Sequence, residues 1–320
     1  MVPFLAVVAI TAAASTAGIL AAASTTLDRV ERIEGLESAL RDPVGDIELY
    51  LVVGSDSRAG ADPTAPDFGG IGTEADVSGQ RSDTLMVLRH DLRTDELALL
   101  SIPRDLWVEI PGRGNDRVNS AYRDGAATVI ETIDRNLGLP IHHYLEVDFN
   151  GFKAIVDAIG GVEMCFDVPT RDLNTGLNIV APGCVVLDGV QALAYARSRY
   201  YEELRDGEWQ RDGTADLGRI ARQQRFVERA LSGAVAAVLA DPFRVGDVAR
   251  AATDAVLVDA ELDLVEAASL ARLGGRSGLA TYSLPVRGET IDDKAVLLLT
   301  DAADDMLSYF RGDGPPPPAG

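Results

Sequence analysis

The chain has 320 residues, of which 47% are hydrophobic, so it can bury the core of one large domain or of two small ones. Its formal net charge of -21 and pI near 4.4 argue against a nucleic-acid-binding protein, because such a protein needs a broad basic face to displace counterions. With three histidines and two cysteines, a zinc site of the His/Cys type is not expected.

The N-terminal segment predicts export. Residues 4–24 carry no charged side chain, and an apolar run of this length can cross a hydrocarbon core of roughly 30 Å. We expect a single transmembrane helix within residues 1–26, and a cleavable signal peptide ending near residues 21–23 is the alternative. Either interpretation places the rest of the chain on the extracytoplasmic side of the cell membrane.

The remainder divides into a charged stalk at 27–46, helical over 25–41, a main domain at 47–310 and a disordered proline-rich tail at 311–320. Apolar runs and alternating patterns predict strands at 47–54, 83–89, 97–102, 144–147, 162–166, 185–187 and 280–284. Helical patterns cover 119–137, 149–159, 190–196, 261–273 and 292–309. Residues 59–79, rich in Gly, Pro and Asp, form a long loop. Strands that alternate with helices indicate a layered α/β domain.

The segment 195–227 concentrates seven arginines in an otherwise acidic protein. Arginine suits a phosphate-rich polyanion because its planar fork binds oxygen atoms in pairs and stays charged. A solvated charged helix is the alternative. At about 100° per residue, Asp216, Arg219 and Gln223 share one narrow helix face. That face borders an apolar stripe (Leu217, Ile220, Val227, Leu231 and Val238) and becomes apolar towards its end at Phe226, Ala230 and Ala237. Such an edge suits a ligand with an anionic head and a hydrocarbon tail.

The two cysteines, Cys165 and Cys184, flank a turn-rich segment. A disulfide that closes this loop fits an exported protein, and two unpaired core thiols are the alternative.

Seven segments together resemble the LytR-CpsA-Psr family of cell-wall glycopolymer transferases, of the actinobacterial type. They occur in the family's order and cover roughly residues 47–239. The segments are VVGSDSR (52–58), QRSDTLMVLR (80–89), SIPRDLWVEIPG (101–112), RVNSAY (117–122), VDFNGFKAIVDAIGGV (147–162), LDGVQALAYARSR (187–199) and DLGRIARQQ (216–224).

The resemblance implies a three-layer α/β/α domain with a mixed central sheet, behind the single N-terminal transmembrane helix. It implies transfer of a glycan phosphate from a polyprenyl-pyrophosphate carrier to a peptidoglycan hydroxyl, at the membrane and with Mg²⁺ or Mn²⁺. The glycan would be arabinogalactan, a teichoic-acid-like polymer or a capsule. A polyprenyl-pyrophosphate hydrolase and a non-catalytic polyprenyl-lipid-binding protein are the alternative functions.

By the same resemblance, Asp56 and Asp83 match the metal-binding aspartates. The residues that match pyrophosphate contacts are Arg58, Arg104, Arg117, Arg197, Arg199, Arg219 and Gln223. The residues expected to act in catalysis are Arg104, Asp216 and Arg219, with Asp216 either orienting Arg219 or assisting removal of the acceptor proton. The expected lipid groove is formed by Val156, Ile159, Leu193, Phe226 and Ala230, together with Ala194 and Ala237.

Each residue also has an ordinary structural interpretation. Aspartates at strand ends often cap turns, Arg104 and Asp105 form a local ion pair by adjacency alone, and the groove residues can be ordinary core. Arg197 and Arg199 are two apart, so they converge on one ligand only if the helix ends between them.

Overall fold

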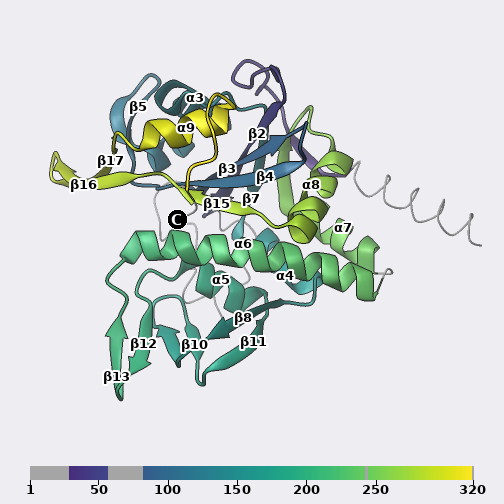
Figure 1. The fold of residues 1–320 in the computed structure, drawn as a ribbon, viewed down its shortest axis with the longest axis vertical. Coiled ribbons are helices and arrows are strands. Elements are labelled where there is room, and N and C mark those ends of the chain that lie inside the picture. The colour runs from purple at the N-terminus through teal and green to yellow at the C-terminus, as the bar shows by residue number, and fades with distance from the viewer. Residues whose placement is uncertain (1–28, 57–81, 242–243, 319–320) are drawn as a thin grey trace, which may run out of the picture.

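The computed structural model describes residues 29–56, 82–241 and 244–318. A seven-stranded sheet forms its centre (Figure 1). The strands lie in the order β1 (Glu31–Ile33), β14 (Val256–Asp259), β7 (His143–Val147), β2 (Ile47–Ser55), β3 (Ser82–Asp91), β4 (Glu96–Ile102) and β15 (Ala280–Ser283). The sheet is mixed, because β2 runs parallel to β7 but antiparallel to β3.

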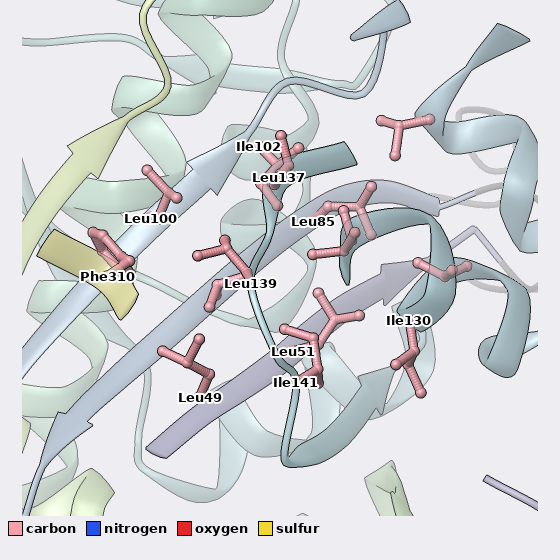
Figure 2. Close-up of a cluster of buried hydrophobic side chains, with 14 of the residues drawn as sticks. Leu49, Leu51, Leu85, Leu100, Ile102, Ile130, Leu137, Leu139, Ile141 and Phe310 are labelled. Atoms are coloured by element: carbon pink, nitrogen blue, oxygen red, sulfur yellow. The ribbon is translucent and has the colours of Figure 1, made fainter. Parts of the chain in front are cut away.

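Helices cover both faces of the sheet. Along β2, Leu49, Leu51 and Val53 face one side, where they pack with α3 (Ala126–Leu137) and α9 (Ala303–Arg311) (Figure 2). Tyr50 and Val52 face the other side, towards the layer of α6 (Ala215–Ala240) and α8 (Leu264–Ser277). The alternation of side chains along the strands thus yields the α/β/α architecture expected for the chain.

A smaller lobe lies across α6 from the sheet (Figure 1). It contains α4 (Phe149–Ala158), α5 (Gly189–Arg197), α7 (Arg244–Ala255), the hairpin β8 (Val162–Phe166) and β11 (Gly183–Leu187), and the sheet β10 (Leu177–Ile179), β9 (Thr170–Asp172), β12 (Glu202–Arg205) and β13 (Glu208–Arg211). Cys165 and Cys184 are direct partners in the β8–β11 register, with sulfur atoms 1.96 Å apart. The two cysteines are therefore placed as a disulfide, as the sequence suggested.

The helix predicted over 292–309 is wrong in its first half. The hairpin β16 (Val286–Ile291) and β17 (Lys294–Leu299) precedes α9, and it packs beside the hairpin β5 (Trp107–Ile110) and β6 (Gly114–Arg117). Asp292 and Asp293 form the two-residue turn, both with positive φ (49° and 60°). The helix was predicted from the spacing of apolar residues alone, and that spacing carries no information about a two-residue turn.

The predicted helical stalk is also wrong where the structure describes it. Residues 31–33 form β1, which pairs in parallel with β14, and the Arg32 guanidinium donates to the main-chain oxygens of Asp259, Ala260 and Leu262. Leu36 and Ala39 are buried in the main core. A three-residue strand whose partner lies more than 200 positions away leaves no local pattern.

The expected membrane anchor and the loop at 59–79 fall on residues outside the described ranges. Within those ranges, no helix combines the length and apolarity that a membrane crossing requires. Residues 315–318 of the proline-rich tail form neither helix nor strand.

Gly189 allows α5 to approach α4 closely. A Cβ atom at this position would lie 2.6 Å from the main-chain oxygen of Lys153. We expect Gly189→Ala to lower the free energy of unfolding by about 1–3 kcal/mol, because the backbones must separate. Gly233→Ala, within α6, is the control, because a Cβ atom there would meet nothing within 4 Å, and it should raise the free energy of unfolding by up to about 1 kcal/mol. Urea denaturation measures both, and equal effects would contradict the close-packing argument.

Candidate active site

Arginines from three parts of the chain surround the Asp216 carboxylate in the first turn of α6. Its Oδ1 lies 2.7 Å from Arg199 Nε and 3.6 Å from Arg219 Nη1, and its Oδ2 lies 3.3 Å from Arg104 Nε. Burial disfavours the ionised carboxyl group, but Arg219, a hydrogen bond with Asp105, Arg104 and Arg199 lower the pKa of Asp216 to about 2. Asp216 is therefore a firmly ionised anchor for these guanidinium groups.

Asp105 extends this arrangement to Arg117. Its Oδ2 lies 3.6 Å from Arg104 Nε, and its Oδ1 lies 3.5 Å from Arg117 Nε. The Asp105 and Asp216 carboxyl groups are within hydrogen-bonding reach of each other, and burial followed by that contact raises the pKa of Asp105. We call these six residues, Asp105, Asp216, Arg104, Arg117, Arg199 and Arg219, the arginine cluster.

Asp105 and Arg117 each have a buried polar atom that finds no hydrogen-bond partner among the described residues. These atoms are Asp105 Oδ1 and Arg117 Nε, which face each other across a distance too long for a hydrogen bond. Buried groups of this kind require an explanation, and a bound ligand or ion that completes the bonding is one such explanation. Asp105 was not among the site residues predicted from the sequence, because its position next to Arg104 was explained by a local ion pair.

The turn after α5 brings Arg199 to Asp216. The helix ends at Arg197, and Ser198 is extended, so the two arginines are no longer constrained to different helix faces. The buried Asp172 Oδ2 accepts hydrogen bonds from Ser198 Oγ (2.7 Å) and from the main-chain nitrogens of Arg199 (3.0 Å) and Tyr200 (2.9 Å). Asp172 therefore determines the path of the main chain that presents Arg199.

Gln223 does not contact the arginine cluster in the described hydrogen bonds but joins α6 to two neighbouring elements. Its side-chain nitrogen donates to Thr84 Oγ1 at 2.9 Å, beside Asp83, and to the main-chain oxygen of Ala196 at 3.1 Å. The neighbouring Arg197 lies over the Phe149 ring, with Cζ 4.5 Å from the ring centroid. These contacts join Gln223 in α6 to the start of β3 and to the last turn of α5.

The predicted metal residues come to one edge of the sheet. Asp56 follows the last residue of β2, and Asp83 is the second residue of β3. The antiparallel register skips one residue here, so Asp83 is the extra residue of a bulge opposite the end of β2. The side chain of Asp83 and the whole of Arg58 fall outside what the structure describes.

A buried hydrogen-bond network lies next to the end of β2 that carries Asp56. Glu146 accepts hydrogen bonds from the hydroxyl groups of Tyr122 and Tyr144 (2.8 Å for the latter), and the Tyr122 hydroxyl also lies 3.0 Å from Ser55 Oγ. Tyr122 belongs to the 3-10 helix η2 (Val118–Asp124), which follows Arg117. The network ties the Arg117 segment to the end of β2.

The residues expected to line a lipid groove lie in the hydrophobic layer between α6 and the smaller lobe. Val156, Ile159 and Phe226 are buried members of one cluster, and Ala230 packs against it. Leu193 is buried beside Phe149. Leu217, predicted for the apolar stripe, is instead half exposed at the first turn of α6.

Comparison with known proteins gives a consistent result. The model of the LytR_cpsA_psr family matches residues 19–309. The chain is 38% identical over 266 residues to the probable cell wall biosynthesis protein LcpB of Corynebacterium glutamicum, covering 82% of this chain and 60% of the relative's length. It is 31% identical over 235 residues to the polyisoprenyl-teichoic acid–peptidoglycan teichoic acid transferase TagU of Oceanobacillus iheyensis, covering 71% and 69%.

Solved structures share the fold. A LytR-Csp2A-Psr enzyme from Actinomyces oris superposes with a TM-score of 0.66 at 24% identity, covering 88% of this chain and 96% of that one. A structure of TagT bound to LI-WTA gives a TM-score of 0.64 at 19% identity, covering 89% and 98%.

We expect Asp172→Ala to lower the free energy of unfolding by about 3 kcal/mol, because it leaves several buried donors without an acceptor. The change should also weaken any ligand contact made by Arg199. Thermal and urea unfolding measure the first effect. Asp167→Ala, at an exposed position in the same lobe, is the control and should stay within about 0.5 kcal/mol of wild type. A similar loss in both variants would contradict the role given to Asp172.

Proposed function

Because the chain belongs to the LytR-CpsA-Psr family, we propose that it transfers a glycopolymer phosphate from a polyprenyl-pyrophosphate carrier to a peptidoglycan hydroxyl. The arginine cluster is the observation that carries this proposal. Its four guanidinium groups face two carboxylates, so two positive charges remain for a ligand even when both aspartates are ionised. A pyrophosphate has the charge and the oxygen geometry that such a site binds.

The relatives support the substrate class. LcpB of C. glutamicum is named as a probable cell wall biosynthesis protein, and TagU of O. iheyensis as a teichoic acid transferase to peptidoglycan. The chain spans about 60% of the length of LcpB, so we extend these names to it only as a proposal. We propose a membrane-anchored enzyme with its domain outside the cytoplasm, where the Cys165–Cys184 disulfide would persist.

Asp56 and Asp83 are the residues proposed to hold Mg²⁺. Carboxylate oxygens are the donors that this ion prefers, and both residues stand at the same edge of the sheet. A bound Mg²⁺ would neutralise charge on the pyrophosphate oxygens. Gln223, through Thr84, positions α6 against this edge.

The apolar layer next to α6 is proposed to receive the polyprenyl chain. Phe226 and Ala230 continue the face that begins with Arg219 and Gln223, so a lipid attached to a pyrophosphate at the arginine cluster would extend along them. Because Val156, Ile159 and Phe226 are buried against one another, lipid entry requires α4 and α6 to separate locally.

The two aspartates differ in what they can do with a proton. Asp216, with a pKa of about 2, is a weak base, and its contacts suit it to orient Arg104, Arg199 and Arg219. The raised pKa of Asp105 makes it the better base. The acceptor oxygen would bond to phosphorus as its proton passes to Asp105. The phosphorus attacked is the one that carries the glycan. Its bond to the oxygen that bridges the two phosphates breaks, and polyprenyl phosphate leaves with the electron pair of that bond.

The transfer is tested with the purified chain, a short polyprenyl-pyrophosphoryl glycan, peptidoglycan fragments and Mg²⁺. Mass spectrometry follows polyprenyl phosphate and the phosphodiester-linked glycan. We expect Arg104→Ala to lower the rate of both at least about 100-fold, because one charge-stabilising group is lost. A chelator should abolish product.

Arg229→Ala removes an exposed arginine from α6 and is the matched control, with a rate close to wild type. Polyprenyl phosphate without linked glycan would identify a hydrolase. Tight binding of the lipid with neither product would contradict an enzyme and leave a lipid-binding protein.

Asp105 is tested by the pH dependence of kcat. As the pH falls through the pKa of Asp105, the base becomes protonated and kcat should decrease. Asp105→Asn should lower kcat by about 100-fold or more and remove this acidic limb. In Asp216→Asn, the decrease in the residual kcat should begin at a lower pH than in wild type. The reason is that the Asp216 charge is one cause of the raised pKa of Asp105. An unchanged acidic limb in Asp105→Asn would rule out Asp105 as the base.

A further inference from the structure

All three histidines of the chain gather away from the arginine cluster, around the first residues of β2. Two of them have clear structural partners. His142 Nδ1 accepts a hydrogen bond from the main-chain nitrogen of Leu49 at 2.8 Å. His143 Nδ1 lies 3.3 Å from Asp259 Oδ2, and this carboxylate raises the pKa of His143 against the opposing effect of burial.

His90 is different. Its side chain is buried, with 6% of the residue exposed, and its Nε2 lies 3.3 Å from Asp95 Oδ1. Its Nδ1 finds no hydrogen-bond partner in the part of the chain that the structure describes. A buried imidazole nitrogen without a partner requires a reason, and a role as a metal ligand is one such reason.

Two carboxylates stand beside this imidazole. Glu48 is directly opposite His90 in the antiparallel register of β2 and β3, and Glu266 comes from the first turn of α8. One ligand atom from each of the three residues lies within 4.8 Å of the other two. In the part of the chain that the structure describes, this is the one such group of His, Cys, Asp and Glu side chains.

The charges favour a cation. Glu48 and Glu266 repel each other. The Tyr50 hydroxyl donates to Glu48 Oε2 at 2.7 Å, and the nearby His143 imidazole, when protonated, offsets one of the two negative charges. A divalent ion would balance the two negative charges, with the His90 imidazole as the third ligand.

We propose that Glu48, His90 and Glu266 form a binding site for a divalent transition-metal ion such as Zn²⁺. An imidazole with two carboxylates suits zinc better than Mg²⁺ or Ca²⁺, which take oxygen donors. Asp95 on the opposite ring nitrogen is the outer partner that metal-bound histidines commonly have, and it leaves Nδ1 free to bind the ion.

Such an ion would fasten α8 to the sheet. In α8, Gly275 packs so closely on α6 that a Cβ would lie 2.5 Å from the main-chain oxygen of Leu231. A metal ion at this site would therefore stabilise the packing of α8 on α6, the helix that carries Arg219. Glu48 precedes Asp56 by eight residues of extended chain, roughly 26 Å, so this site is distinct from the proposed Mg²⁺ site.

The test is equilibrium dialysis of the purified, chelator-treated chain, without a polyhistidine tag, against Zn²⁺ in the presence of excess Mg²⁺. We expect one tightly bound zinc ion per chain and an unfolding temperature that rises with zinc concentration. Glu266→Gln and His90→Gln should each weaken zinc binding by about 10-fold or more. Co²⁺ in place of zinc should give visible ligand-field bands that Glu266→Gln abolishes.

Two controls locate the binding. Glu131→Gln changes an exposed helical carboxylate elsewhere, and Asp56→Asn changes the proposed Mg²⁺ site; both should bind zinc as wild type does. Glu266 lies on a surface helix, so its variant should fold even if the His90 variant does not. No zinc binding by wild type, or binding that Glu266→Gln leaves intact, would overturn the proposal.

Discussion

The candidate active site depends on one constraint: the fold brings four positively charged guanidinium groups together, and their charge must be compensated. Asp216 and Asp105 supply half of that compensation while no polyanion is bound. Like charges at such distances repel strongly in a partly buried environment, so without these carboxylates the arginines would turn towards solvent. With them, the donors are already oriented when a pyrophosphate arrives, and little reorganisation is left for the reaction itself.

Helix α6 links this electrostatic site to the hydrophobic core. Its first turns present Asp216, Arg219 and Gln223, and its later turns pack between the central sheet and the smaller lobe (Figure 1). Because both sides of the helix are packed, the register of its polar residues is set by the core. The Asp172 network then brings the turn after α5 to the same place.

The strands β2 and β3 carry both cation sites that we propose, one at each end. The end at Asp56 and Asp83 offers oxygen donors beside the arginines, which suits Mg²⁺ and phosphate. The end at Glu48 and His90 offers an imidazole and carboxylates beside α8, which suits a structural ion. The same pair of strands therefore separates a proposed reaction site from a proposed stabilising one.

The sequence by itself determined the layered α/β class, most strands and helices of the core, and the identity of Arg104, Arg199, Arg219 and Asp216 as neighbours. It could do so because side-chain periodicity and a run of family motifs are local properties. It did not determine β1, the β16–β17 hairpin, Asp105 or the grouping of His90 with Glu48 and Glu266. Those depend on contacts between residues far apart in the chain, and only the packed tertiary structure decides which side chains share a buried space and must therefore share charge and protons.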